Sequence, residues 1–325
     1  MAGLSQAEIE QYHDLGYVMK PDVFTRPDLQ PLRDELSGVV DREARRLFAV
    51  GRLTRLYADE PFERRIARVF GEAEEIYRAI LGKGGGGHKG RAMFEVIRHP
   101  RLLACVESLI GPEIVGSSVY RVRPKIPGML HGEVPWHQDS GYFMPHCDRD
   151  LIVTCWVPLV DATEENGCLQ VLARAHRQGV ARHYTGGHAG YLEVPADELP
   201  EGEVVTVPVP LGGVLFMTNL TPHRSTENRT DVVRWSIDLR YQGADVPNNV
   251  DRPPEAVDLN APETEIACYP PEGDFVIQSP SRPEREVRAW EAFHEIRQRY
   301  ERAQVPYMAS RRWTPMAERG TMNKA

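Results

Sequence analysis

The sequence predicts a mainly β protein, an antiparallel sandwich or barrel that follows a helical N-terminal layer. Residues 1–112 carry apolar side chains at helical spacing, whereas residues 113–242 contain short apolar or alternating runs bounded by Pro, Gly and Asn. No helical pattern separates these runs, which favours strands that pair directly with one another. Residues 243–325 form a C-terminal extension, and we interpret the whole chain, 1–325, as a single domain.

The composition excludes several classes of protein. Hydrophobic residues make up 41% and charged residues 26% of the 325 residues, as is usual for a globular protein. Asp and Glu number 47 against 39 Lys and Arg, so the formal charge is −8, and we expect no nucleic-acid partner, which would call for a basic face. No apolar run approaches the roughly 20 residues of a membrane span, so we expect no membrane partner either.

The start of the chain and the cysteines indicate a cytoplasmic location. The first 20 residues contain acidic side chains and lack the apolar core of a secretory signal. The chain has five cysteines, an odd number without a CxxC pair, at positions Cys105, Cys147, Cys155, Cys168 and Cys268. We expect reduced thiols that are buried as small apolar residues.

Four helical stretches are expected in the N-terminal layer, at 7–15, 27–46, 60–81 and 92–110. Ser5 is placed to cap the first of them and Gly16 to end it. The segment GKGGGGHKG at 82–90 is expected to be a mobile loop, since four consecutive glycines hold no fixed conformation. It and the loop 125–134 are the two candidate lids.

Six runs predict the strands of the core: IVGSSVYRVR, LIVTCWVPLV, GCLQVL, EVVTVPVP, GGVLFMTN and VVRWSIDLRYQ. After the core, the Pro-rich stretch 245–283 is expected to be irregular. A charged amphipathic helix is expected at 284–304.

The segment VPWHQDSGYF holds the pattern that indicates chemistry. His137 and Asp139 are two residues apart, so on an extended strand both side chains point to the same face. His223 begins a later strand, and two histidines with one carboxylate form a facial triad that leaves half of an octahedral iron open. Ser225 and Arg234 follow at +2 and +11, and a buried arginine beside a hydroxyl can hold a dicarboxylate.

Most of residues 5–242 resemble the phytanoyl-CoA dioxygenase family of Fe(II)/2-oxoglutarate-dependent oxygenases. The resemblance rests on four ordered motifs: the opening LSQAEIEQYHDLGYVMKPDVFTRPDLQPLRDEL, then WHQDSGYF, DLIVTCWVPLVDATEENGCLQVLARAHRQG and PHRSTENRTDVVRWSIDLRYQ. In the third motif Ala173 and Ala175 stand where the family more often has Pro and Ser. The resemblance implies a double-stranded β-helix, a jelly-roll or cupin-like barrel, flanked by N-terminal and C-terminal helices.

The resemblance also implies roles for single residues. His137, Asp139 and His223 look like the ligands of Fe(II). Arg234, assisted by Ser225, looks like the partner of the distal carboxylate of 2-oxoglutarate, and Trp156 looks like an aromatic wall of its pocket.

The activity implied is that of a dioxygenase that uses 2-oxoglutarate and O2 as cosubstrates, releases succinate and CO2, and acts on a small-molecule metabolite or natural product. Related halogenases have a small residue in place of the carboxylate ligand. Because this chain keeps Asp139, we expect hydroxylation or desaturation.

Four residues are candidate substrate contacts: Tyr142, Phe143, Arg240 and Arg123. Tyr142 and Phe143 follow the metal motif, and the alternative for both is ordinary core packing. Arg234, Ser236, Asp238 and Arg240 alternate along one strand and should share its cavity face. The alternative for Arg240 is an ion pair with Asp238.

The remaining polar candidates have plainer interpretations. For Arg123 and Lys125 the alternative to a ligand contact is a solvated strand end. His131 and His146 are expected in solvated loops. Surface positions are expected for His176, His183 and His188.

Two other functions remain open at this stage. A zinc hydrolase or lyase can use the same two histidines and aspartate, but leaves Arg234 and Ser225 without a task. A non-catalytic relative that keeps the fold for binding would normally lack a ligand, and none is missing here. The sequence leaves the oligomeric state open.

Overall fold

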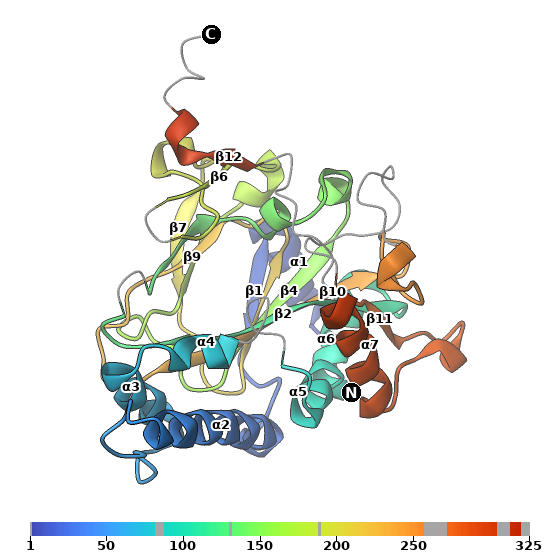
Figure 1. Ribbon diagram of the computed structural model, residues 1–325. Coiled ribbons are helices and arrows are strands. Elements are labelled where there is room, and N and C mark those ends of the chain that lie inside the picture. Colours follow the sequence, from blue (N-terminus) through green and yellow to red (C-terminus); the bar gives the residue numbers. More distant parts are fainter. Residues whose placement is uncertain are drawn as a thin grey trace.

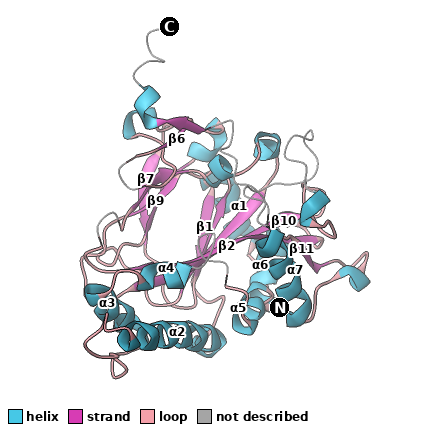
Figure 2. Cartoon of the chain, viewed as in Figure 1, coloured by secondary structure: helices cyan, strands magenta, loops and turns pink. Residues whose placement is uncertain are grey.

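The computed structural model describes residues 2–81, 88–129, 132–187, 190–256, 272–303 and 313–319. Two antiparallel sheets lie at its centre, and most helices lie on one side of them (Figures 1 and 2). The predicted sites Cys268, His131 and His188 lie outside the described residues, as do 82–87 of the glycine-rich segment and residues 130–131 of the second candidate lid. Both lids therefore stay predictions.

The larger sheet has six strands in the order β1-β8-β4-β10-β2-β11. Their bounds are Tyr17–Lys20, Val214–Thr218, Ile152–Pro158, Arg234–Gly243, Ile114–Lys125 and Phe275–Gln278. The smaller sheet has the order β3-β9-β5-β7, with bounds Val134–His137, His223–Ser225, Leu169–Ala173 and Glu203–Val207. A parallel pair joins β6 (His183–Thr185) to β12 (Trp313–Pro315). The two facing antiparallel sheets confirm the jelly-roll prediction.

Seven helices lie within the described residues. They are α1 (Gln6–Leu15), α2 (Arg26–Ala49), α3 (Phe62–Glu72), α4 (Ile76–Leu81), α5 (Arg91–Ile97), α6 (Pro100–Ile110) and α7 (Trp290–Ala303). Ser5 caps α1 in a reciprocal capping box, and Gly16 ends it at φ +88°, as predicted. The stretch 60–81 forms two helices rather than one, because Ala73 adopts an extended conformation that ends α3.

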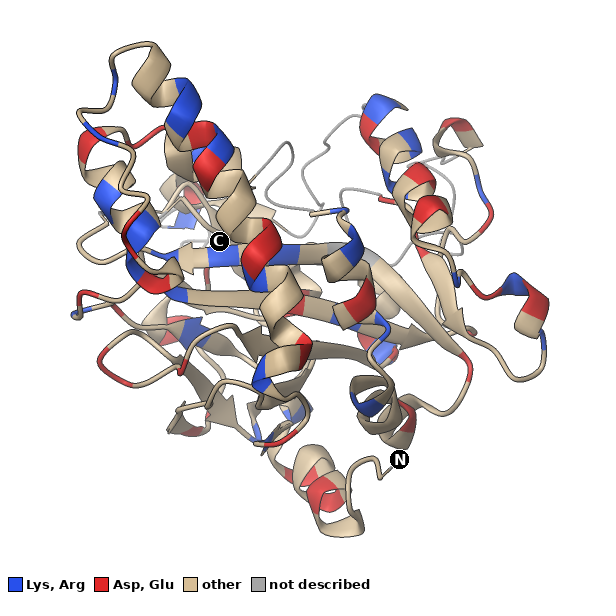
Figure 3. Cartoon of the chain, turned by 90° about the horizontal axis from the view of Figure 1, so that it is seen from below, with Lys and Arg blue, Asp and Glu red and all other residues tan. Residues whose placement is uncertain are grey.

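The helices cover the outer face of the larger sheet. One core cluster joins their apolar side chains to Val153 and Cys155 of β4 and to Trp235 and Ile237 of β10. A second cluster fills the space between the sheets, where Trp156 and Leu215 meet Leu169 and other residues of the smaller sheet. On the helices, acidic and basic residues are interspersed (Figure 3), as in the ion pair of Arg45 with Asp41.

Strand β10 is central to the larger sheet, between β4 and β2. Its odd-numbered side chains Trp235, Ile237 and Leu239 are buried in the helix-facing core, and Trp235 stacks on Phe62 of α3 at a centroid distance of 4.9 Å. Its even-numbered side chains face the opposite side, as the period of a strand requires. This confirms the alternation predicted for the strand.

Two expectations about the C-terminal part need correction. The stretch 245–283 is not wholly irregular, because Phe275–Gln278 form β11 at the edge of the larger sheet, where Phe275 pairs with Gly116. A buried aromatic cluster explains this strand: Phe275 and Phe94 both pack on Phe293 of α7. The helix predicted at 284–304 begins later, at Trp290.

The four described cysteines are buried and unbridged, as predicted. Burial raises the pKa of the Cys105 thiol to about 11, so that this thiol stays protonated and unreactive. Among the described helices, none has both the length and the apolar character needed to cross a membrane.

The packing of β10 generates a stability prediction. The variant Trp235→Ala removes a fully buried indole between the sheet and α3, and should lower the free energy of unfolding by about 3–5 kcal/mol. Urea unfolding followed by circular dichroism measures this loss. The control Val204→Ala changes a side chain that is 51% exposed and should cost less than about 0.5 kcal/mol. A loss below about 1 kcal/mol in Trp235→Ala would contradict the packing described.

Candidate metal centre

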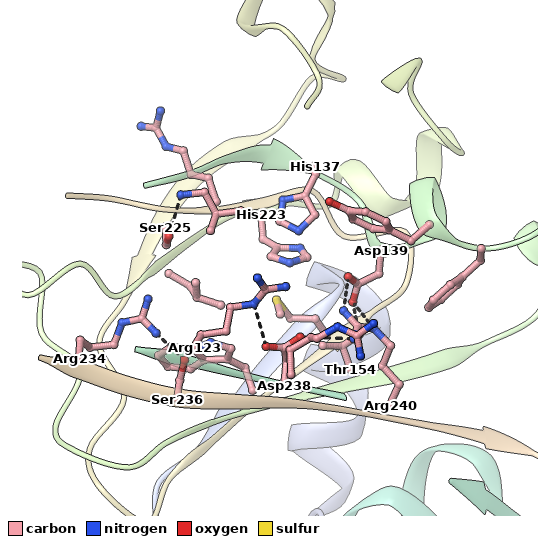
Figure 4. A pocket seen from close by; sticks show the side chains of 18 residues that line it. Arg123, His137, Asp139, Thr154, His223, Ser225, Arg234, Ser236, Asp238 and Arg240 are labelled. Atoms are coloured by element: carbon pink, nitrogen blue, oxygen red, sulfur yellow. Dashed lines mark hydrogen bonds and ion pairs between the residues drawn. The ribbon is translucent and has the colours of Figure 1, made fainter. Parts of the chain in front are cut away.

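His137, Asp139 and His223 converge on one point inside the barrel. One ligand atom from each lies within 4.8 Å of those of the other two, and all three side chains are buried. The two imidazole rings lie 4.3 Å apart, because His137 ends β3 directly opposite His223 at the start of β9. The arrangement fits a facial triad of two nitrogens and one oxygen (Figure 4).

Backbone carbonyls orient both imidazoles. The Nδ1 atom of His137 lies 2.9 Å from the carbonyl oxygen of Pro135, and that of His223 lies 3.0 Å from the carbonyl oxygen of Thr221. Each Nδ1 therefore carries the proton, which leaves each Nε2 lone pair for a metal. Burial, together with the nearby His223, lowers the pKa of His137 well below its usual value, so this ring is neutral and ready to bind.

Asp139 is held from the side opposite the histidines. Arg240 donates from Nη2 to Oδ1 at 2.6 Å and from Nε to Oδ2 at 3.2 Å, and the Thr154 hydroxyl also donates to Oδ2. Burial by itself would raise the pKa of Asp139, but the charge of Arg240 outweighs it and holds the pKa well below the usual value. The carboxylate is thus ionised and fixed in orientation.

The local backbone explains why His137 and Asp139 point the same way. Strand β3 ends at His137 and Asp139 begins a short 3-10 turn, but Gln138 between them keeps an extended conformation. The Gln138 side chain turns away from the cavity and donates to the carbonyl oxygens of Gly179 and Leu220 at 2.8 and 2.7 Å. The sequence prediction of a shared face is confirmed, although only part of the motif lies on a strand.

His183 corrects one expectation. The sequence suggested a surface position, but the side chain is fully buried and its Nε2 accepts a hydrogen bond of 2.9 Å from the Gln138 amide. It thereby anchors the backbone between the two metal-motif residues. Nothing in the spacing of the histidines could indicate this contact, because it joins β6 to the residue that follows β3.

Arg234 lies across the cavity from the triad and has no carboxylate partner among the described residues. Its guanidinium is buried, lies 5.1 Å from the centre of the Trp156 ring, and donates only to Ser236 Oγ, at 2.5 Å. Its Nε has no hydrogen-bond partner, and burial lowers the pKa of Arg234 to about 10. A buried cation in this state calls for an anionic ligand.

The predicted site residues line one cavity. It has a volume of 240 Å³, and its lining includes the triad, Arg234, Ser225, Trp156 and the four predicted substrate contacts Tyr142, Phe143, Arg240 and Arg123. Ser225 faces it from the smaller sheet, and its hydroxyl accepts from the Val134 amide at 3.1 Å. The roles assigned to Ser225 and Trp156 stay predictions, as do the substrate contacts.

Arg240 and Lys125 differ from their sequence interpretations. Arg240 lies 3.4 Å from Asp238, as the alternative held, but its closer partner is the metal-motif residue Asp139. Lys125 is not a solvated strand end: it is buried, donates to the carbonyl oxygens of Gly132 and Thr226 at 2.7 and 2.6 Å, and burial lowers its pKa to about 7.

A residue that the sequence analysis did not single out packs behind Tyr142, next to the centre. Trp313 on β12 donates from its indole nitrogen to the Gly141 carbonyl at 2.6 Å. Its ring packs edge-on against Tyr142 at 6.1 Å, and Tyr142 packs in the same way against His137. The C-terminal segment therefore supports the wall next to the metal ligands. No motif marks it in the sequence.

Comparisons with known proteins show which sequences are similar to this chain. The model of the phytanoyl-CoA dioxygenase family matches residues 12–236. The human protein "Phytanoyl-CoA dioxygenase, peroxisomal" is 26% identical over 244 residues, which cover 72% of this chain and 67% of the human one. The phytanoyl-CoA dioxygenase of Arabidopsis thaliana is 22% identical, with 74% and 90% covered.

A solved structure supports the fold. The apo form of the non-heme monooxygenase ThoJ is similar with a TM-score of 0.53 and 19% sequence identity, over 90% of this chain and 96% of that one. Since the family model spans more than half of the sequence, this chain belongs to the phytanoyl-CoA dioxygenase family of Fe(II)- and 2-oxoglutarate-dependent oxygenases.

Proposed function

We propose that this enzyme hydroxylates or desaturates a small-molecule metabolite or natural product, with conversion of 2-oxoglutarate and O2 to succinate and CO2. The observation that carries the proposal is the pairing of two features in one cavity. A buried triad of metal-ligating type lies on one side, and on the other lies a buried guanidinium without a carboxylate partner among the described residues.

The residues of the triad fit Fe(II). Neutral imidazole and an ionised carboxylate are the ligand types that non-heme Fe(II) oxygenases use, and three protein ligands leave positions open. We assign His137 through Nε2, Asp139 and His223 through Nε2 as the ligands. When bound, the iron supplies the oxidising power that cleaves 2-oxoglutarate and attacks an unactivated C–H bond.

The protein's own contribution is to bind, orient and exclude water. Arg234 is assigned to the distal carboxylate of 2-oxoglutarate, because a guanidinium fork binds a carboxylate bidentately and this one has unused donors. Trp156 holds the guanidinium in place by stacking. Leu169 and Met217 line the same cavity and keep it partly apolar, which strengthens these electrostatic contacts.

Asp139 favours hydroxylation or desaturation over halogenation. A carboxylate at this position fills the place that a halide would need, and Arg240 and Thr154 hold it firmly there. A cytoplasmic site of action stays a prediction; the unbridged state of the four described cysteines supports it.

Succinate formation tests the proposed reaction. Purified protein with Fe(II), 2-oxoglutarate and O2 should release succinate, and anaerobic addition of Fe(II) and 2-oxoglutarate should produce a visible charge-transfer band. Zn(II) should support neither. In His137→Ala both signals should be lost while circular dichroism shows the fold retained, because the metal loses a ligand. Succinate release that persists in this variant, or that Zn(II) supports equally, would contradict the ligand assignment or the reaction class.

Arg234 supplies a second prediction. The variant Arg234→Met removes the charge-assisted hydrogen bonds to the cosubstrate and should raise KM for 2-oxoglutarate by roughly 10- to 100-fold. The variant Arg149→Met, which changes an exposed arginine, should leave this KM unchanged. A KM within twofold of wild type in Arg234→Met would remove the assignment.

Thr154 is a positioning residue, and its role predicts a change in metal binding. The variant Thr154→Val keeps the shape but removes the hydroxyl that donates to Asp139, and should weaken Fe(II) binding about tenfold. Thr154→Ser should restore it. Titration of Fe(II) at saturating 2-oxoglutarate measures the dissociation constant, and saturating Fe(II) should recover most of the turnover. Wild-type affinity in Thr154→Val would show that the hydroxyl has no such role.

A further inference from the structure

Arg123 lines the cavity, but the reaction proposed above gives this cation no role. It lies on β2 opposite Ser236 of β10, and its side chain reaches into the cavity (Figure 4). Its only hydrogen bond within the described chain is a long one, from Nε to Asp238 Oδ1 at 3.3 Å. Both terminal Nη groups are therefore available, and the side chain is 36% exposed at the cavity.

The other arginines that line the cavity are engaged elsewhere. Arg121 pairs with Glu272 at 3.0 Å. Arg224 follows His223 on β9, so its side chain points to the other face of that strand. There it donates to Gln170 at 2.8 Å and stacks on Trp136. Neither guanidinium is presented to a ligand in the way that Arg123 is.

The charge of the central cavity supports an anionic substrate. The lining holds five arginines and two aspartates, and Glu272 pairs with one of the arginines, Arg121, so positive charge is in excess. Fe(II) and the 2-oxoglutarate dianion cancel each other. The loaded cavity thus keeps an excess of positive charge, which favours a negatively charged group on the substrate.

One phenol group, that of Tyr142, lines this part of the cavity. The phenols of Tyr77 and Tyr191 also lie close enough to Arg123 to affect its pKa. Burial raises the pKa of Tyr142 to about 12, so its hydroxyl keeps its proton. A guanidinium fork with a protonated phenol nearby is suited to binding a carboxylate.

We propose that the substrate carries a carboxylate that is bound by Arg123 and Tyr142, next to the metal centre. The inference rests on the proposed function and names the substrate class for that same site. We propose a carboxylate because its two oxygens match the fork of a single guanidinium; a phosphate ester is the alternative that the experiment tests. The 240 Å³ cavity must also hold 2-oxoglutarate, so the buried part of the substrate is small.

Calorimetric titration tests this inference on the protein loaded anaerobically with Fe(II) and saturating 2-oxoglutarate. The probes are hexanoate and phenylacetate, each compared with its amide, and phenyl phosphate. At least one carboxylate should bind about tenfold or more tightly than its amide. Arg123→Met should abolish this preference, Arg123→Lys should keep part of it, and the exposed-site control Arg149→Met should keep all of it.

The charge-transfer band of the same samples tests the proposed function separately from the proposed substrate class. A band that fails to form in the wild type would remove the proposed function. A normal band without any carboxylate preference would overturn only the present inference. Three further results would also overturn it: an unchanged preference in Arg123→Met, tighter binding of phenyl phosphate than of the carboxylates, or competition between the carboxylate and 2-oxoglutarate.

Discussion

The cross-strand pair of His137 and His223 is the contact on which the site depends. The two residues are far apart in the sequence, but antiparallel pairing of β3 and β9 places them directly opposite each other. A register shift, a β-bulge or irregularity between Val134 and His137, then places Ser225 opposite Val134. A slip of one residue between these strands would turn one histidine to the other face of the sheet. The register is therefore as important to the chemistry as the identity of the ligands.

The register is held from both sides of the smaller sheet. Within the sheet, β9 also pairs with β5 on its other edge, where Val171 lies opposite His223. Val171 belongs to the core cluster between the sheets. On the other side, the Gln138 amide and side chain are bound by His183 and by two backbone carbonyls. These contacts fix the backbone of the metal motif before any metal binds, which is the preorganisation that a metal site needs.

The larger sheet supplies the charges that act on this centre. Its helix-facing side is apolar, whereas the cavity side of β10 presents Arg234, Ser236, Asp238 and Arg240. Buried charges of this kind are costly unless they are paired. Arg240 is paired with the carboxylate of Asp139, whereas the Nε of Arg234 has no hydrogen-bond partner. Arg123 lies on the neighbouring strand β2, opposite Ser236. The number of carboxylate and hydrogen-bond partners thus distinguishes an arginine that positions a metal ligand from one that can bind an anionic ligand.

The sequence by itself determined the features that follow from local periodicity. The strand alternation of β10, the shared orientation of His137 and Asp139, and the capped start of α1 depend on neighbouring residues alone, so they could be predicted. The tertiary structure decided the contacts between distant segments: Arg240 on Asp139, His183 on Gln138, Trp313 on Gly141, and the burial of Lys125. Such contacts depend on which strands become neighbours and in which register, and the periodicity of one strand carries no information about that.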